Sequence, residues 1–244
     1  MNGTVWEVLP DAILLPGLRS DGFVFAVSTV AAGDMHIATG DSGRAARESF
    51  VRTYGMGLPL VCGNQIHGNR IEILTETKRA IFEGTDGCLV PQGVSVAAGV
   101  FTADCLAICL LDRRRREFVL VHSGWRGTQA GLPLKALRLL ESRGTRMADL
   151  RVVFAPSIQP CCYEVGPEFR EHFPDGPFRE QHGQLFFDNQ GAAAGMLLSA
   201  GVPVSQIDVS PWCTVCDSER RFWSWRRQGQ TAGRMMTIVA PIET

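Results

Sequence analysis

The 244-residue sequence lacks an excess of charge of either sign, because 24 Lys and Arg residues stand against 25 Asp and Glu residues. Proteins that bind duplex nucleic acid normally carry a basic face, and so do proteins held electrostatically on anionic membranes. The sequence also lacks an apolar run of about 18 residues, the length that a membrane-spanning helix requires. We therefore expect no nucleic acid and no membrane among the partners of this protein.

Two further signatures are missing from the sequence. Residues 1–7 have neither the basic region nor the apolar core of a secretory signal peptide, so we expect a cytoplasmic protein. Its eight cysteines are then expected to be reduced thiols that are buried, catalytic or metal-binding. Neither standard glycine-rich phosphate-binding spacing occurs, which weighs against P-loop enzymes and dinucleotide-dependent enzymes.

The rest of the pattern predicts one mixed domain over residues 1–244. A chain of this length with 45% hydrophobic residues can bury a large core without metal or disulfide staples. We expect strands at 22–29, 58–66, 70–74, 118–122, 150–154, 207–209 and 237–239, and helices at 43–55, 130–141, 169–173 and 188–200. Because no regular βαβ order appears, the sequence favours an α+β fold with mixed sheets.

Residues 102–122 are typical of a β-hairpin that carries two candidate metal ligands. The apolar stretch that ends at Leu111 is separated from strand 118–122 by a polar turn. If that turn is centred on residues 114 and 115, Cys105 faces position 124 and His122 lies on the same face of the hairpin. The two side chains can then reach one shared atom.

His67, between two expected strands, is a candidate third ligand. One thiolate and two imidazoles leave a fourth tetrahedral position open, as in catalytic zinc sites, and a water there would have its pKa lowered towards neutrality. Spacing alone leaves two other interpretations open. Cys105 could be a buried small hydrophobe beside a hydrogen-bonded His122, or it could be a nucleophile with His122 as its base and no metal.

Six motifs then follow one another in a fixed order over about residues 60–240. They are Gln65-Ile66-His67-Gly68, Thr102-Ala103-Asp104-Cys105-Leu106, Val121-His122-Ser123-Gly124-Trp125-Arg126-Gly127, Pro160-Cys161-Cys162-Tyr163-Glu164-Val165-Gly166, Phe222-Trp223-Ser224-Trp225-Arg226-Arg227 and Thr231-Ala232-Gly233-Arg234-Met235. In this combination the chain resembles the laccase-domain family of the YfiH type, whose members are described as polyphenol oxidases or purine nucleoside phosphorylases.

The resemblance implies a four-layer α/β/β/α sandwich and a single zinc ion held by His67, Cys105 and His122. It also implies phosphorolysis of adenosine, inosine, guanosine or methylthioadenosine, together with deamination of adenosine. We expect a purine nucleoside and phosphate as partners, and a monomer or homodimer. The oxidase name implies copper. Copper fits less well, because a multicopper oxidase needs more histidines than the five in this sequence.

Phosphorolysis needs a cation for the phosphate, and a guanidinium grips oxyanions bidentately. The family has an Asn-Arg pair that falls on Ala46-Arg47 here, and we expect Arg47 to act in catalysis as the phosphate ligand. Arg126 either serves the same purpose or pairs with Asp104, whose carboxylate needs an Arg partner or a backbone group to bind.

The remaining motif residues have more ordinary interpretations. Trp225 is expected on a strand with Trp223, where one ring either stacks on a purine or packs in the core. We interpret adjacent Cys161 and Cys162 as packing residues, since two neighbouring cysteines do not easily chelate one ion. Cys213-x-x-Cys216 is interpreted as structural, because no second Cys pair of that spacing accompanies it.

The main functional hypothesis is a zinc-dependent purine nucleoside phosphorylase with adenosine deaminase activity. Three alternatives remain: a metal-free Cys-His hydrolase acting on cell-wall precursors, a copper oxidase of phenols, and a non-catalytic nucleoside-binding protein.

Overall fold

The computed structural model describes residues 4–78 and 80–242, which build two large mixed sheets and one small sheet. In spatial order, the seven-stranded sheet contains β1 (Glu7–Val8), β2 (Ala12–Leu14), β3 (Phe23–Ser28), β16 (Met235–Pro241), β8 (Ala97–Thr102), β4 (Leu60–Asn64) and β6 (Ala80–Glu83). The six-stranded sheet contains β15 (Ile207–Val209), β11 (Leu150–Phe154), β9 (Leu106–Asp112), β10 (Glu117–Ser123), β7 (Gly87–Val90) and β5 (Ile71–Ile73). The small sheet contains β12 (Glu164–Val165), β14 (Gln184–Phe187) and β13 (Phe178–Gln181).

Six α-helices accompany these sheets in the described part of the chain. They are α1 (Gly40–Tyr54), α2 (Trp125–Gln129), α3 (Leu132–Ser142), α4 (Phe169–His172), α5 (Asn189–Ser199) and α6 (Trp225–Gln228). Short 3-10 turns lie at Pro16–Leu18, Val30–Ala32, Ile37–Thr39, Met147–Asp149, Val204–Gln206 and Gly229–Thr231.

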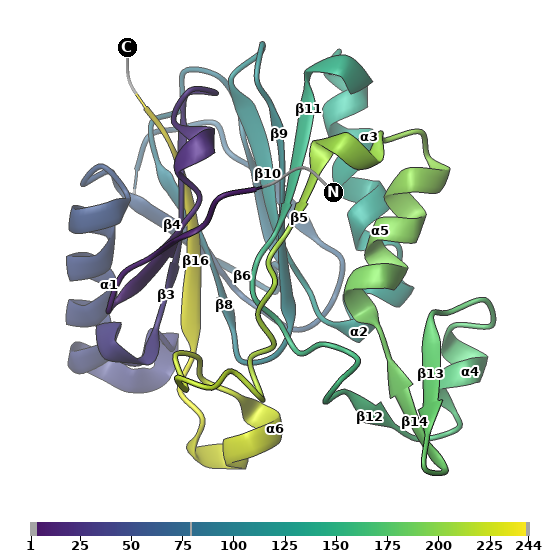
Figure 1. Cartoon of the computed structure of the whole chain (residues 1–244). Coiled ribbons are helices and arrows are strands. Elements are labelled where there is room, and N and C mark those ends of the chain that lie inside the picture. The colour runs from purple at the N-terminus through teal and green to yellow at the C-terminus, as the bar shows by residue number, and fades with distance from the viewer. Residues whose placement is uncertain (1–3, 79, 243–244) are drawn as a thin grey trace.

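The two large sheets lie face to face between helices, which gives the order α1, seven-stranded sheet, six-stranded sheet, then α3 and α5 (Figure 1). Three apolar clusters fill the three spaces between these layers. Phe23 and Phe118, for example, meet edge to face between the sheets with ring centroids 5.7 Å apart. The expected four-layer α/β/β/α sandwich with mixed sheets is confirmed.

Strand β9 explains why residues 106–111 are apolar without interruption. Alternate side chains point to opposite faces of a strand, and both faces of this strand are buried. Ala107, Cys109 and Leu111 join the cluster between the two sheets, whereas Leu106, Ile108 and Leu110 join the cluster beneath α3 and α5. The same alternation in β10 turns Phe118 and Leu120 towards the other sheet.

The long apolar stretch before Leu111 is divided between two layers rather than forming one strand. Strand β8 belongs to the seven-stranded sheet and β9 to the six-stranded sheet, so the chain crosses between the sheets at residues 103–105. Asp104 has a φ of 87° at this crossing, a backbone conformation that few side chains adopt. The crossing brings Cys105 to the end of the space between the two sheets.

The predicted hairpin is confirmed together with its register. Glu117 pairs with Asp112 and Ser123 with Leu106, as a turn centred on residues 114 and 115 requires. His122 therefore follows Phe118 and Leu120 on the face that looks towards the other sheet.

The C-terminal tryptophans do not lie on the expected strand. Residues 221–224 form no strand, and Trp225 begins helix α6. The Ser224 side chain accepts a hydrogen bond from the Arg227 backbone N–H, which is the interaction of an N-cap residue. The helix starts at this cap. The alternation of Trp223 and Trp225 indicated a strand instead, so the sequence did not reveal the cap.

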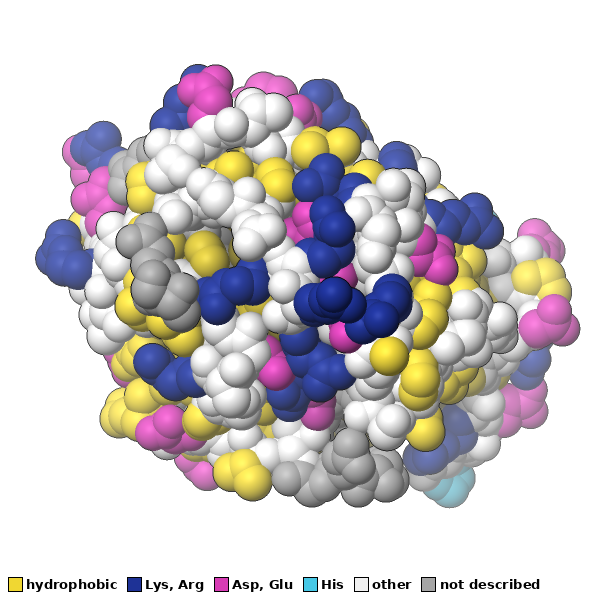
Figure 2. All heavy atoms as spheres, turned by 90° about the horizontal axis from the view of Figure 1, so that it is seen from above, with side chains coloured by type: hydrophobic (Ala, Val, Ile, Leu, Met, Phe, Trp, Pro, Cys, Tyr) yellow, Lys and Arg dark blue, Asp and Glu magenta, His cyan; other side chains and the backbone are white. Residues whose placement is uncertain are grey.

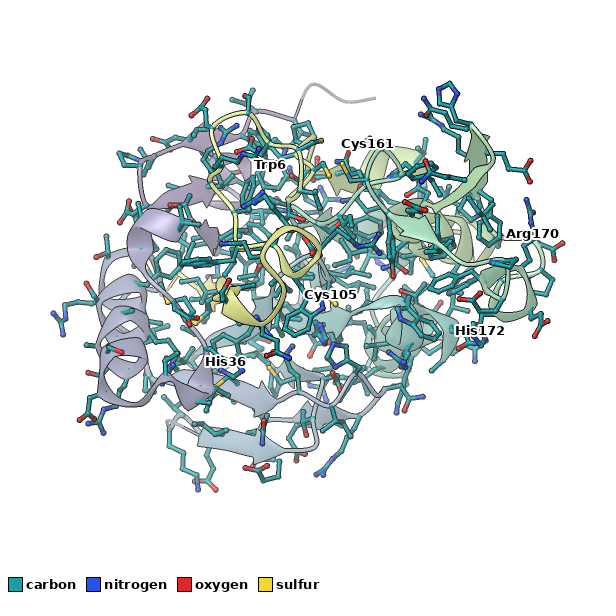
Figure 3. All side chains as sticks on the ribbon, turned by 90° about the horizontal axis from the view of Figure 1, so that it is seen from below. Trp6, His36, Cys105, Cys161, Arg170 and His172 are labelled. Atoms are coloured by element: carbon teal, nitrogen blue, oxygen red, sulfur yellow. The ribbon has the colours of Figure 1, made fainter. Side chains whose placement is uncertain are left out.

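Seen from the end opposite to Cys105, the molecule shows a gathering of basic side chains (Figures 2 and 3). Three arginines of the described chain are paired with acids: Arg115 and Arg143 with buried Glu117, and Arg151 with Asp21 and Asp208. These partners satisfy the guanidinium groups within the protein itself. Among the described helices, none has the length and apolar character needed to cross a membrane.

Candidate active site and metal centre

Three side chains that are far apart in the sequence converge at the end of the space between the sheets. One ligand atom each from His67, Cys105 and His122 lies within 4.8 Å of the others. His67 follows β4, Cys105 precedes β9, and His122 lies near the end of β10. The two imidazole rings meet edge to face, with centroids 4.8 Å apart. The predicted convergence of these three residues is present in the structure, and Figure 3 shows Cys105 near the centre of the face seen from below.

The loop that carries His67 is held by one buried carboxylate, that of Asp86. His67 itself has a φ of 60°, so its backbone needs support. The backbone N–H groups of His67 and Gly68 donate to Asp86 at 2.9 and 2.8 Å, and the N–H of Ile66 donates at 3.3 Å. Three consecutive N–H groups thus bind a single side chain.

Asp86 also fixes the orientation of the second imidazole. His122 Nδ1 lies 3.0 Å from Asp86 Oδ1, and both side chains are buried. With Nδ1 donating its proton to the carboxylate, Nε2 is left as the acceptor or metal-binding atom. A carboxylate in this position is the usual outer partner of a metal-binding histidine.

The electrostatics of the cluster favour a charged sulfur. Burial alone would raise the pKa of Cys105, but His122 and His67 outweigh it and lower the pKa to about 6. Burial would likewise lower the pKa of His122, yet the Cys105 thiolate and Asp86 raise it to about 9. Asp86, despite its burial, has a lowered pKa because it accepts hydrogen bonds from His122 and from the Gly68 and Ile66 backbone. The protein therefore stabilises a thiolate, the form that binds metal or attacks an electrophile.

One sulfur and two imidazole nitrogens are a donor set suited to zinc or copper ions, and three ligands leave a coordination position for water or substrate. The three atoms converge and the Asp86 hydrogen bond supports one of the rings, so the residues present fit a catalytic metal ion. This convergence argues against the interpretation of Cys105 as a simple packing residue.

The cluster borders a cavity of about 600 Å³. Cys105, His67 and His122 contribute to its wall. The wall also contains His36, Ile37, Ala38, Gly63, Asn64, Gln65, Phe101, Thr102, Ala103, Asp104, Gly124, Trp125, Arg126, Ile158, Tyr163, Asn189, Trp225, Arg226 and Arg234. A cavity of this size accommodates a molecule as large as a nucleoside.

Three of the lining residues are arginines that each lie over an aromatic ring. Arg126 lies over Trp125 at 4.2 Å, Arg226 over Tyr163 at 5.6 Å, and Arg234 over Trp225 at 5.7 Å. Cation–π contact with the ring face holds each guanidinium in place, and N–H groups at the guanidinium edge that bind no carbonyl can donate to an anion.

Asp104 is the one acidic residue among the described lining residues, so its carboxylate does not balance the three arginines. It accepts hydrogen bonds from the Thr214 hydroxyl, the Ser224 hydroxyl and the Arg226 backbone N–H. Asp104 thus binds a backbone group, one of its two expected roles, and its described partners do not include the Arg126 guanidinium. The cavity is consequently cationic.

The expected binding residues divide into two groups. Arg126 and Trp225 line the cavity, whereas Arg47 is not among the described lining residues. The buried Arg47 side chain donates to the backbone oxygens of Met35 and His36 at 3.1 and 2.7 Å. Its position on α1 supports the loop that brings His36 to the cavity, and the phosphate role expected of Arg47 stays a prediction.

Sequence reasoning missed Asp86, His36 and Arg234. Asp86 lies in a Gly-Thr-Asp-Gly segment that is typical of a turn, and a buried role was not evident there. The signal that could have identified it is an acidic residue directly before the apolar strand β7. Arg234 appeared only as a member of the last motif, and His36 belonged to none of the motifs. Burial and the charge of Arg234 lower the pKa of His36.

Comparisons with known proteins agree with this architecture. The chain is 41% identical to a purine nucleoside phosphorylase of Aquifex aeolicus over 176 residues, which are 72% of this chain and 79% of that protein. It is 31% identical to the adenosine deaminase RL5 of an unknown prokaryotic organism over 211 residues, 80% of each protein. The crystal structure of YlmD from Geobacillus stearothermophilus superposes with a TM-score of 0.88 at 27% identity, covering 98% of this chain and 100% of that one.

The Bacillus licheniformis protein YfiH has the same fold, with a TM-score of 0.86 at 22% identity over 97% of this chain and 98% of that one. The sequence model described as multi-copper polyphenol oxidoreductase laccase matches residues 26–241. By this match and by its relatives, the chain belongs to the multi-copper polyphenol oxidoreductase laccase family, as its ordered motifs predict.

Proposed function

We propose that this protein is a zinc-dependent purine nucleoside phosphorylase that also deaminates adenosine. The observation that carries the proposal is the three-ligand cluster of His67, Cys105 and His122 in the wall of a cationic cavity of about 600 Å³. Relatives named purine nucleoside phosphorylase and adenosine deaminase support the substrate class. Adenosine, inosine, guanosine and methylthioadenosine are the proposed substrates.

His67, Cys105 and His122 would hold the zinc ion. When bound, zinc would supply a Lewis acid for water activation or for polarising the substrate. Zinc is preferred to copper because its tetrahedral preference suits one thiolate and two imidazoles, and because the whole chain has five histidines. The role of Asp86 is to keep His122 Nε2 directed at the ligand position.

The cavity arginines would bind the phosphate. In phosphorolysis a phosphate oxygen forms a bond to the anomeric carbon of ribose, the glycosidic C–N bond breaks, and its electron pair leaves with the purine. Arg126 is the best-suited phosphate ligand, because its guanidinium lies over Trp125 and has no hydrogen bond to another described residue. Arg226 and Arg234 already donate to backbone carbonyls and would add positive charge.

The aromatic residues of the cavity would hold the base. Trp225 is 50% exposed, a large amount for a tryptophan, and lies at the wall beside Arg234. Stacking on a purine would cover this apolar surface and remove water from the reacting bond.

The test is incubation of the purified protein with inosine or adenosine in the presence and absence of phosphate. We expect phosphate-dependent release of the free base with ribose 1-phosphate, conversion of adenosine to inosine, and loss of both on chelation. The Cys105→Ala variant should be inactive. Absence of any free base and of inosine at micromolar enzyme would contradict the proposal.

One observation favours a second candidate, a metal-free hydrolase. Asp86, His122 and Cys105 have the order of orienting acid, base and nucleophile, and the thiolate is stabilised. Such a hydrolase would leave Cys105 open to alkylation and would retain activity without metal. Stoichiometric zinc and resistance of Cys105 to alkylation would decide for the phosphorylase.

A further inference from the structure

A second group of sulfur atoms lies away from the cavity. The Sγ atoms of Cys161, Cys162, Cys213 and Cys216 all lie within 4.8 Å of one another. Figure 3 shows Cys161 well apart from Cys105, on another part of the face seen from below. We propose that these four cysteines bind one structural zinc ion, which fastens together two loops of the cavity wall.

The spacing of the sulfurs suits tetrahedral coordination. A zinc–sulfur bond of about 2.3 Å places tetrahedral sulfurs about 3.8 Å apart. Cys161 Sγ and Cys216 Sγ are 3.6 Å apart, and the other pairs lie within the 4.8 Å limit. Four thiolates complete the shell of a zinc ion, unlike the three ligands of the first cluster, and closed shells are typical of structural sites.

Two tight turns bring the sulfurs together. In the first turn, the backbone N–H groups of Cys162 and Tyr163 both donate to the carbonyl of Gln159, which lets two adjacent cysteines face the same point. The second turn begins at Cys213 and ends at Cys216. A parallel bridge between Ser157 and Cys213 aligns the two turns side by side.

The surroundings of Cys213 are those of a charged sulfur. The Gln159 N–H donates to Cys213 Sγ at 3.5 Å. An N–H group that donates to a sulfur stabilises its thiolate form. The guanidinium of Arg227 adds positive charge, since it binds the carbonyl oxygens of Thr214 and Val215 in the same turn.

The packing role expected for Cys161 and Cys162 is not supported. Cys161 and Cys216 are exposed and Cys162 is partly exposed, so burial does not explain them. All four are free cysteines, and Cys161 Sγ and Cys216 Sγ are 3.6 Å apart, well beyond the disulfide length of about 2.05 Å. A single ion uses all four, and each thiol that binds would release its proton to solvent.

The metal would act on the cavity through the two loops. Tyr163, which lines the cavity, directly follows Cys162. Thr214, inside the second turn, donates to Asp104 at 2.6 Å, and Asp104 adjoins Cys105 and binds the first turn of α6. The proposed ion therefore fixes both the wall that carries Tyr163 and the helix that carries Trp225 and Arg226.

The test is the zinc content of the full chain purified under reducing conditions. We expect two zinc ions per chain in the wild type, and one each in Cys105→Ala and in the double variant Cys161→Ser/Cys216→Ser, which changes exposed residues only. Cys88→Ala is the matched control: this thiol is buried and belongs to neither cluster, so both ions should remain. The metal count tests this site independently of catalysis, because Cys105→Ala removes the proposed catalytic ion alone.

Alkylation of the intact protein gives a second readout that does not depend on the folding of a variant. We expect Cys161 and Cys216 to resist iodoacetamide until a strong chelator is added, and then to react. A wild type with one zinc ion that the double variant retains, rapid alkylation of exposed Cys161 without chelator, or a mass decreased by a disulfide would each overturn the proposal. So would a double variant that keeps both ions.

Discussion

Asp86 Oδ1 lies 3.0 Å from His122 Nδ1 and also accepts the backbone N–H of His67 at 2.9 Å, so one buried oxygen positions both histidines of the cluster. The other oxygen, Oδ2, accepts the N–H groups of Gly68 and Ile66. All four groups are donors, and only a carboxylate offers acceptors on both sides. The geometry of the proposed metal site therefore depends on a residue that is not a ligand.

The Asp86→Asn variant tests this dependence. Whichever way the new amide is turned, its NH₂ group faces N–H donors, so the loop of His67 or the ring of His122 must move. We expect metal affinity to fall about 10–100-fold, the usual effect of losing such an outer partner. Competition with a chromophoric chelator measures the affinity.

The matched control for Asp86→Asn is Glu83→Gln. Glu83 is an exposed acid in the preceding strand whose carboxylate accepts a hydrogen bond from Asn64. The Glu83→Gln substitution should leave the metal affinity unchanged. An Asp86→Asn protein that binds metal within twofold of the wild type would show that the hydrogen bonds of Asp86 do not position the ligands.

Gly124 offers a way to disturb the ligands without replacing any of them. A Cβ atom added there would lie 3.0 Å from Cys105 Sγ and 3.4 Å from His67 Cδ2. The backbone of Gly124, with φ −60° and ψ 172°, accepts alanine without strain, so only this contact is at issue. We expect Gly124→Ala to lower metal affinity by about tenfold, because metal–ligand distances tolerate errors of only about 0.2 Å.

The control for Gly124→Ala is Gly195→Ala in α5, where an added Cβ meets no described atom within 4 Å. Alanine is favoured over glycine in a helix by about 1 kcal/mol, so this variant should unfold at a slightly higher temperature and bind metal normally. Equal metal affinity in the two variants would count against close approach of Cys105 to residue 124.

The sequence predicted the hairpin that carries Cys105 and His122, but it did not predict the Asp86 hydrogen bonds that hold His67 and His122 in place. The polar turn fixed the register of β9 and β10, and with it the common face of Cys105 and His122, because side chains alternate strictly along a strand. The residues alone made His67 a candidate third ligand, and the ordered motifs then led us to expect it beside Cys105 and His122. Its actual cause, the Asp86 carboxylate, joins residues 18 to 36 positions apart, and no periodicity reports such a contact.

Arg47 illustrates a different limit. Its place in the motif indicated phosphate binding, but the side chain turns into the protein and binds the carbonyls of Met35 and His36. A guanidinium donates to phosphate oxygens and to carbonyl oxygens alike, and the sequence does not say which of them it will meet. The four-cysteine cluster was hidden for a similar reason, since adjacent cysteines converge only when a turn such as that at Gln159 redirects them.

Arg126 and Arg47 should consequently differ when each is removed. Arg126→Ala should raise the KM for phosphate about 10–100-fold, corresponding to about 1.5–3 kcal/mol for a lost charged hydrogen bond, with little change in thermal stability. Arg47→Met should instead lower the free energy of unfolding by about 1–3 kcal/mol, because buried carbonyls lose their donor. Steady-state kinetics at varied phosphate and thermal denaturation measure the two effects. The opposite pattern would return the phosphate role to Arg47.

Substitutions of His67 and His122 should affect stability differently, because the two side chains differ in burial although both are proposed ligands. His67 is exposed on a loop with a φ of 60°, which asparagine adopts readily, whereas the His122 side chain is 2% exposed and bonded to Asp86. His67→Asn should therefore abolish metal binding at the cluster of His67, Cys105 and His122, while the metal-free protein melts at the same temperature as the metal-free wild type. His122→Ala should abolish metal binding at the same cluster. It should also lower the free energy of unfolding by about 1–3 kcal/mol, because it leaves a cavity and a buried Asp86 carboxylate with one hydrogen-bond partner fewer. Melting curves of the metal-free proteins, with metal analysis alongside, distinguish the two. Equal loss of stability in both variants would mean that the His67 imidazole is part of the folded core rather than a ligand held on a supported loop.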